Sequence, residues 1–349
     1  MNALVLHAVG DARYQSIRIP EPQQLEVRIR VGFCGVCGSD IPRFFGDGPH
    51  TLPLVCGHEF AGTIEKLGSS VDNFRIGDRV AVFPLLWCGN CGPCALGKFA
   101  QCLRYNYLGS RSDGAFAEFV TAPALNLIRL PLHVSLEEAA LIEPAAVALH
   151  ALRRAGGCSV GDCIAIFGAG PIGLMVAQWA RIMGASVIII FDIVTEKLSL
   201  ARQLGFSDVF DAREEDPVQT VEHLTSGSGA QVCIDAAGVY QTTLQSLQAA
   251  RRNARVVLLG NPADDVLLSR KIISRLMRRE VQILGTWNSE YSIAGNDDDW
   301  HHTITAIASG VIDVNPLISH KVRLRDAFEA LKMLRDRREH CCKMLIYAE

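Results

Sequence analysis

Residues 163–183 read CIAIFGAGPIGLMVAQWARIM. The stretch begins as a short apolar strand, continues as G-x-G-x-x-G, and ends in an apolar helix from Leu174 to Met183. In this context the glycines permit a tight turn and close approach to a pyrophosphate, whose charge sits at the helix N-terminus. The pattern predicts a dinucleotide-binding unit whose contact residues are Gly168, Gly170, Pro171, Ile172 and Gly173.

The next apolar segment, 187–191, ends in Asp192, which lies 19 residues beyond Gly173. A carboxylate at this place binds the adenosine ribose hydroxyls and repels a 2′-phosphate, so the sequence favours NAD over NADP. Lys197 could close over the ribose edge, although a solvated helix lysine fits that position almost as well.

Three later apolar segments, at 232–235, 255–259 and 281–284, continue the alternation of strands and helices that is typical of a parallel α/β sheet. Ligands of such sheets bind at the carboxyl ends of the strands. We therefore expect cofactor contacts at the last two strand ends, from Leu259, Gly260 and Thr286.

The first 150 residues follow a different pattern. Apolar and charged residues alternate at 26–31, which is the period of a half-buried strand. Glycine-rich turns separate further short strands, expected at 60–65, 79–83 and 115–120. Many short strands joined by glycine turns indicate a barrel-like β domain.

The C-terminal part is less regular. We expect a helix at 327–334 and a final strand at 343–347 that returns to the first domain, and we interpret Asp297–Asp299 as a solvated loop. The predicted organisation is a barrel-like domain over 1–149, completed by 287–349, with a nucleotide-binding domain over 150–286.

Composition sets the broad class of protein. A chain of 349 residues is long enough for two domains, and 49% hydrophobic with 20% charged residues suits a globular enzyme. A net charge of −3 argues against a nucleic-acid partner. The start lacks the pattern of a signal peptide, and glycine, proline and arginine interrupt the most apolar window, so we expect a cytoplasmic protein without a membrane partner.

Twelve cysteines in a chain of this kind indicate metal sites or reduced thiols. Four of them follow the spacing C-x₂-C-x₂-C-x₇-C, and all four ligands of one ion could come from this short loop: Cys88, Cys91, Cys94 and Cys102. A closed structural zinc site is the preferred interpretation. An iron–sulfur cluster or plain thiols are the alternatives.

A second group of possible ligands lies between residues 37 and 59. Cys37, His58 and a carboxylate are the side-chain types of a catalytic zinc site, which leaves one coordination position open. Glu59 and the distant Glu143 compete for the acid's place, bound directly or through water. Taken alone, this stretch is weak evidence, because short motifs recur freely and a lone cysteine is usually a small buried hydrophobe.

In combination and in this order, the Gly57-His58-Glu59 site, the four-cysteine loop and the G-x-G-x-x-G unit resemble the zinc-dependent medium-chain dehydrogenase/reductase family. The resemblance spans essentially the whole chain. It implies a GroES-like catalytic domain and a Rossmann domain with a doubly wound parallel sheet. It also implies two zinc ions per chain, NAD(P)-dependent interconversion of alcohols and carbonyls, and a homodimer or homotetramer.

The resemblance implies roles for two residues close to Cys37. Ser39 is placed to pass the alcohol proton, with a simple turn hydroxyl as the alternative. Asp40 is expected to orient His58. Three residues beyond the hydroxyl position, where related alcohol dehydrogenases often have a histidine that relays protons, this chain has Pro42.

Within the family, Glu143-Pro144 and the Gly57-His58-Glu59 site resemble the polyol dehydrogenase branch. Three shorter stretches resemble its members that act on sugar-alcohol phosphates of the galactitol 1-phosphate type: 39–43, 57–62 and 109–114. The implied substrate is a sugar alcohol or its phosphate. Enzymes of the sorbitol or xylitol type and of the L-threonine 3-dehydrogenase type are alternatives, and so is a non-catalytic protein that binds nucleotide.

A phosphorylated substrate would need cations near the metal. Arg43 closely follows Ser39, and Arg111 sits in the turn 109–114, where backbone N–H groups could assist. Lys98 and Arg104 are weaker candidates. Each of these side chains could equally be a solvated surface cation.

Overall fold

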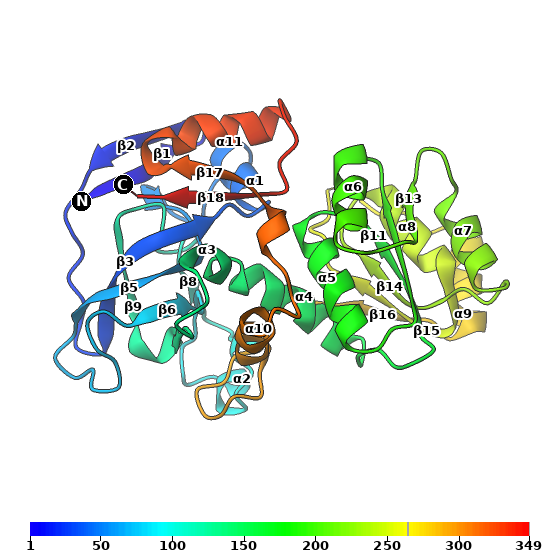
Figure 1. The fold of residues 1–349 in the computed structure, drawn as a ribbon, viewed down its shortest axis with the longest axis horizontal. Coiled ribbons are helices and arrows are strands. Elements are labelled where there is room, and N and C mark those ends of the chain that lie inside the picture. Colours follow the sequence, from blue (N-terminus) through cyan, green and yellow to red (C-terminus); the bar gives the residue numbers. More distant parts are fainter. Residues whose placement is uncertain (264, 349) are drawn as a thin grey trace. The chain divides into compact units, whose positions relative to one another are not determined.

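The computed structural model describes residues 1–263 and 265–348. It divides the chain into two compact units, Met1–Pro144 with Glu290–Glu349, and Ala145–Ser289 (Figure 1). These limits differ by a few residues from the domain boundaries predicted at 150 and 286. Helix α4 (Ile142–Arg154) runs through both the predicted boundary at 150 and the observed limit after Pro144.

The second unit contains a six-stranded parallel sheet in the order β13-β12-β11-β14-β15-β16 among its described residues. The expected doubly wound sheet is thus confirmed. Its strands are β11 (Cys163–Phe167), β12 (Val187–Asp192), β13 (Val209–Asp211), β14 (Ala230–Asp235), β15 (Ala250–Leu258) and β16 (Gln282–Gly285).

Helices lie on both faces of this sheet, with α5 and α6 on the side nearer the viewer in Figure 1. They are α5 (Pro171–Ile182), α6 (Thr195–Gln203), α7 (Pro217–Leu224), α8 (Tyr240–Ala249) and α9 (Arg270–Arg279). The central strand β11 is buried along its whole length, as expected for a strand covered on both faces.

The first unit is built from antiparallel strands, apart from the parallel pair β17 and β18. One sheet has the order β10-β6-β5-β3-β18-β17, with β9 also paired to β3, and a smaller sheet has the order β2-β1-β4. The long strands β3 (Glu26–Gly35) and β5 (Glu59–Leu67) pair side by side. The predicted final strand is β18 (Lys343–Tyr347), and it pairs with β3 (Figure 1).

The remaining elements of this unit are short. The strands are β1 (Asn2–Ala8), β2 (Asp11–Ser16), β4 (Leu54–Val55), β6 (Arg79–Val82), β7 (Leu85–Leu86), β8 (Asn106–Tyr107), β9 (Phe119–Pro123), β10 (Leu127–Arg129) and β17 (Ile318–Arg323). The helices are α1 (Asp40–Phe45), α2 (Gly92–Ala95), α3 (Leu136–Ala139), α10 (Asp299–Ala308) and α11 (Ala327–Asp336).

Two local expectations were wrong. The strand expected at 115–120 lies at Phe119–Pro123, because the preceding residues pair irregularly with β1 through a single bridge, Ala3 to Ala117. The interpretation of Asp297–Asp299 as a solvated loop fails for its last two residues. Asp298 and Asp299 are buried, and the Asp298 carboxylate accepts hydrogen bonds from the backbone N–H groups of Ser292 and His301.

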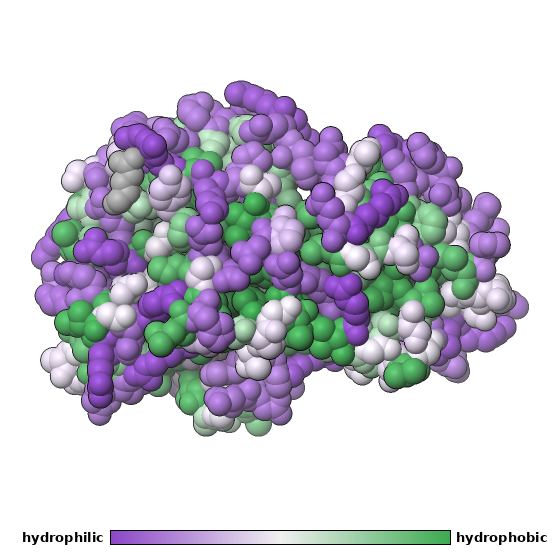
Figure 2. Space-filling view, in the orientation of Figure 1, coloured by the Kyte–Doolittle hydropathy of each residue, from purple (hydrophilic) through white to green (hydrophobic). Residues whose placement is uncertain are grey.

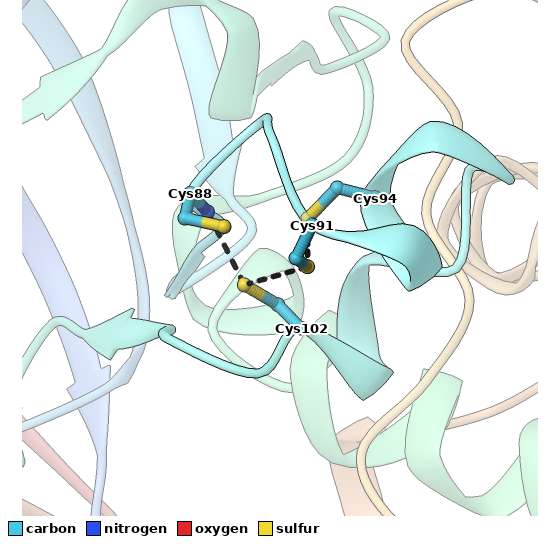
Figure 3. A group of neighbouring side chains, drawn as sticks. All are labelled: Cys88, Cys91, Cys94 and Cys102. Carbon is cyan, nitrogen blue, oxygen red and sulfur yellow. Dashed lines mark hydrogen bonds between the residues drawn. The ribbon is translucent and has the colours of Figure 1, made fainter.

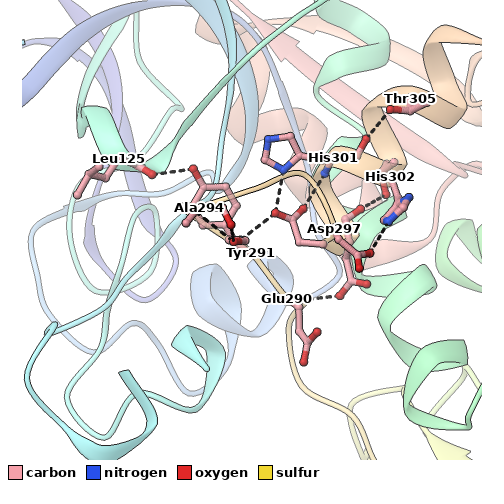
Figure 4. A network of polar contacts seen from close by, with 12 residues as sticks. Leu125, Glu290, Tyr291, Ala294, Asp297, His301, His302 and Thr305 are labelled. Carbon is pink, nitrogen blue, oxygen red and sulfur yellow. Dashed lines mark hydrogen bonds and ion pairs between the residues drawn. The ribbon is translucent and has the colours of Figure 1, made fainter. Parts of the chain in front are cut away.

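Helix α10 is therefore firmly capped at its start (Figure 4). His301 Nδ1 lies 2.8 Å from the Asp298 carboxylate, and the Tyr291 hydroxyl donates to the carbonyl of Leu125. The Tyr291 ring also stacks on Phe83, with 4.8 Å between ring centroids. These contacts attach the start of the C-terminal segment to the β domain.

Each unit has its own apolar core. One gathers around β1, β3, β5 and α11, and the other lies between the parallel sheet and its helices. Hydrophilic side chains predominate on the face that Figure 2 shows, with hydrophobic ones between them. None of the described helices combines the length and the apolar character that a membrane crossing would need.

Candidate active site

Cys37, His58 and Glu59 come together in the first unit. Cys37 lies between the end of β3 and the start of α1, and His58 directly precedes β5. Antiparallel pairing sets Glu59 opposite Gly35, which brings both segments to one place. One ligand atom from each of the three residues lies within 4.8 Å of the others.

The donor set fits a metal cation. His58 is buried, and its Nδ1 atom has no hydrogen-bond partner among the described residues. Burial, followed by the Glu59 carboxylate, raises the pKa of Cys37 to about 12. A thiol of this kind becomes a thiolate when a cation binds beside it, and thiolate, imidazole and carboxylate are zinc ligands.

Asp40 organises the loop that carries Cys37. Its carboxylate accepts a hydrogen bond of 3.0 Å from the backbone N–H of Cys37 and one of 2.5 Å from the Arg43 guanidinium. Its distance to His58 Nδ1 is 3.9 Å, longer than a hydrogen bond. Ser39 precedes α1, and its hydroxyl makes no capping bond to that helix.

Lys343 completes this group from the far end of the chain. Its ammonium lies 2.5 Å from Glu59 Oε2 and 3.0 Å from the carbonyl oxygen of Val36. Burial by itself would lower the pKa of Lys343, but the negative charges of Glu59, Cys37 and Glu143 together outweigh this effect, and the pKa lies above its ordinary value. Sequence reasoning missed this lysine, which reads as an ordinary strand residue.

Glu143, the second candidate acid, lies in the first turn of α4 and outside the set of three. The Tyr107 hydroxyl donates to its Oε1 atom over 3.2 Å, and the Tyr107 ring meets the His58 ring edge-on. Burial raises the pKa of Glu143 to about 7; His58 opposes this rise and Glu59 adds to it. Sequence reasoning also missed Tyr107, although it follows the cysteine loop closely.

The four-cysteine loop closes on itself as its spacing predicts (Figure 3). One sulfur from each cysteine lies within 4.8 Å of the others. Backbone N–H groups of Cys88 and Arg104 point at the Cys102 sulfur, at 3.2 and 3.4 Å. The Arg104 side chain bonds Asn90 and approaches the Cys88 sulfur, so this cation belongs to the loop.

In the second unit, the G-x-G-x-x-G segment forms a tight turn that leads into helix α5. Gly168 has φ +114°, and a Cβ atom on Gly173 would lie 1.9 Å from the Gly168 carbonyl oxygen, so both positions require glycine. Helix α5 begins at Pro171, and no side chain caps its N-terminus. Its first N–H groups are therefore available to a phosphate.

The other expected cofactor residues lie at strand ends of the same sheet. Asp192 ends β12, accepts hydrogen bonds from the backbone of Ala169, Ile193 and Val194, and lies 3.4 Å from the Lys197 ammonium. Leu259 and Gly260 follow β15, and Thr286 follows β16. The buried Thr286 Oγ1 has no hydrogen-bond partner among the described residues.

The two arginines proposed to bind phosphate both affect the pKa of one histidine, His50. Burial, then the positive charges of Arg111 and Arg43, lower the pKa of His50. The Arg111 guanidinium lies over the Tyr105 ring, 4.6 Å from its centroid. His50 was not among the sequence candidates, because an exposed loop histidine has no distinctive pattern.

Comparison with known proteins identifies the class. Residues 23–132 match the alcohol dehydrogenase GroES-like domain, and residues 171–309 match the zinc-binding dehydrogenase domain. The chain belongs to the zinc-dependent medium-chain dehydrogenase/reductase family, and it is an alcohol or polyol dehydrogenase.

Among its relatives, galactitol 1-phosphate 5-dehydrogenase of Escherichia coli K12 is 35% identical over 95% of this chain and 96% of its own. The crystal structure of galactitol-1-phosphate dehydrogenase from Escherichia coli superposes with a TM-score of 0.93, at 34% identity over 99% of this chain and 100% of that one. Sorbitol dehydrogenase of Bacillus subtilis is 31% identical over 99% of this chain and 97% of its own.

Proposed function

We propose that this dehydrogenase uses zinc and NAD to oxidise a hydroxyl group of a sugar-alcohol phosphate to a carbonyl. The observation that carries the proposal is the cluster of Cys37, His58 and Glu59, in which His58 and Glu59 are buried. The similarity to galactitol 1-phosphate 5-dehydrogenase and, at 32% identity, to D-arabitol-phosphate dehydrogenase supports the phosphorylated substrate.

Cys37, His58 and Glu59 would hold the catalytic zinc, and the four cysteines of the loop would hold a structural zinc. Zinc held there would polarise the alcohol oxygen, and NAD would accept the hydride. Residues around the site would take up and pass on the proton that the alcohol loses. Ser39 would pass that proton on, since its hydroxyl does not cap α1.

Glu143 is the residue placed to hold a proton inside the site. The Tyr107 hydroxyl donates to its Oε1 atom, and burial raises the pKa of the carboxyl group above its ordinary value, which suits a group that takes up a proton. Asp40 would keep Cys37 in place through the backbone bond and face His58 from 3.9 Å. Glu59 rather than Glu143 is therefore the proposed metal ligand, since it lies with Cys37 and His58.

NAD would lie on the glycine turn of the second unit. Gly168, Gly170, Pro171, Ile172 and Gly173 would contact its pyrophosphate, and Asp192 with Lys197 its adenosine ribose. Leu259, Gly260 and Thr286 would line the rest of the cofactor, and the unpartnered Thr286 hydroxyl supports a ligand there.

The phosphate of the substrate would bind near Arg111, His50 and Arg43. Arg43 is already bonded to Asp40, whereas Arg111 lies over the Tyr105 ring, donates one hydrogen bond to the Tyr105 hydroxyl and keeps its other donors for a ligand. A phosphate dianion would pair with the positive charges of Arg111 and Arg43, which lower the pKa of His50 in addition to its burial. This supports a phosphorylated polyol over a free one.

The test compares kcat/KM for a polyol and for its 1-phosphate, with NAD as acceptor. We expect the phosphate to raise kcat/KM by roughly 10²-fold or more, or about 2.7 kcal/mol of extra transition-state binding. A free polyol that is the better substrate would favour an enzyme of the sorbitol or threonine dehydrogenase type. Cytoplasmic location and a homodimeric or homotetrameric state stay predictions.

A further inference from the structure

Lys343 and Glu59 form a buried ion pair next to the proposed zinc ligands. Their side chains are 5% and 2% exposed, and 2.5 Å separates the two charged atoms. The two residues are far apart in the sequence, because Lys343 begins strand β18 near the C-terminus. A buried lysine is unusual unless it is paired, so this pair is a specific feature of the site.

Three strands fix the geometry of the pair. Strand β5 supplies Glu59, and β18 supplies Lys343, whose ammonium also donates to the carbonyl of Val36 just beyond β3. Strand β3 contributes Gly35, where an added Cβ would lie 2.3 Å from Glu59 Oε2. The carboxylate oxygen thus fills the space that a side chain on β3 would need.

We propose that Lys343 is a positioning residue that holds Glu59 in place for zinc, so that the carboxylate stays where the ligand set needs it even when the metal has left. The inference rests on the proposed zinc centre. A carboxylate has two oxygens, and Lys343 occupies Oε2 while the other can serve the metal. When zinc leaves, Lys343 is the cation that still compensates the buried charge of Glu59.

The experiment measures thermal unfolding of Lys343→Met in two backgrounds. The first is the wild-type protein loaded with zinc, and the second is Cys37→Ala, which lacks a ligand of the catalytic site but keeps the cysteine loop. We expect Lys343→Met to lower Tm by roughly 5 °C or more in the Cys37→Ala background, because a buried anion loses its partner. In the zinc-loaded protein the loss should be less than half as large, since the metal compensates Glu59.

Two variants serve as controls. Lys343→Arg keeps the charge and should recover at least half of the lost Tm in the Cys37→Ala background. Lys66→Met breaks an exposed pair with Glu21 of the same length, 2.5 Å, and should change Tm little in either background.

An equal loss of Tm in both backgrounds, or no recovery with arginine, would mean that Lys343 contributes packing alone, and would overturn the inference. Zinc content separates this failure from failure of the proposed function. If the wild type and Cys37→Ala bind the same amount of zinc, the zinc centre itself is misplaced and the inference falls with it.

Discussion

Gly35 lies opposite Glu59 in the pairing of β3 with β5, and a Cβ atom at Gly35 would come within 2.3 Å of Glu59 Oε2. Glu59 cannot move aside easily, because it is buried and bonded to Lys343. The glycine therefore belongs to the proposed metal site, although it offers no ligand atom.

Gly35→Ala should displace the Glu59 carboxylate and weaken zinc binding at Cys37 and His58. We expect zinc content to fall from two ions per chain towards one, and kcat/KM to fall by about 10- to 100-fold, the usual cost of disturbing a ligand's support. Gly38→Ala is the matched control, since a Cβ there would meet no atom within 4 Å. Full zinc content and activity in Gly35→Ala would contradict this role.

The cysteine loop should stabilise the fold without taking part in catalysis. Cys94→Ala removes one of four ligands, and a structural zinc site contributes folding energy. We expect a loss of heat resistance or solubility, measured by thermal unfolding, with Cys158→Ala as a control outside the loop. A Cys94→Ala protein as heat-stable as the wild type would argue against a structural metal.

Asp192 should set the cofactor preference. Its carboxylate ends β12 and would repel a 2′-phosphate, so we expect NAD to be preferred by at least about tenfold, the scale of 1.4 kcal/mol. Asp192→Ser should erode this preference in kcat/KM measured with NAD and NADP. Glu214→Ser removes the same charge from an exposed site and should leave the ratio unchanged. Equal use of both cofactors by the wild type would refute the assignment.

Arg111 should bind the phosphate of the substrate. Arg111→Ala is expected to remove much of the roughly 10²-fold advantage of a polyol 1-phosphate over the free polyol, and to change kcat/KM for the free polyol little. Arg75→Ala, which removes an exposed arginine from a distant turn, is the control. If Arg111→Ala lowers kcat/KM equally for both substrates, the arginine supports the fold or the site in general.

Much of the fold could be predicted because its signals are local. The segment 163–183 carries its strand, glycine turn and helix in one run, and the structure has β11 and α5 there. The cysteine loop is similarly local, so its spacing alone predicts the convergence of four sulfurs seen in the structure.

The supporting residues could not be predicted, because tertiary register brings them in. Lys343 reaches Glu59 only through the pairing of β18 with β3, and Tyr107 reaches Glu143 from a two-residue strand. Asp298 stands in a run of three acidic residues that looks solvated in the sequence. Its hydrogen bonds at the start of α10 account for its burial. Such contacts leave no periodic pattern in the sequence.

The most direct test of the account is the zinc content of the purified wild-type protein and of Cys37→Ala. The account predicts two zinc ions per chain in the wild type and one in Cys37→Ala, which should remain folded and lose NAD-dependent turnover. A wild-type protein without zinc, or a Cys37→Ala protein that retains both ions, would contradict the central claim that Cys37, His58 and Glu59 hold a catalytic metal.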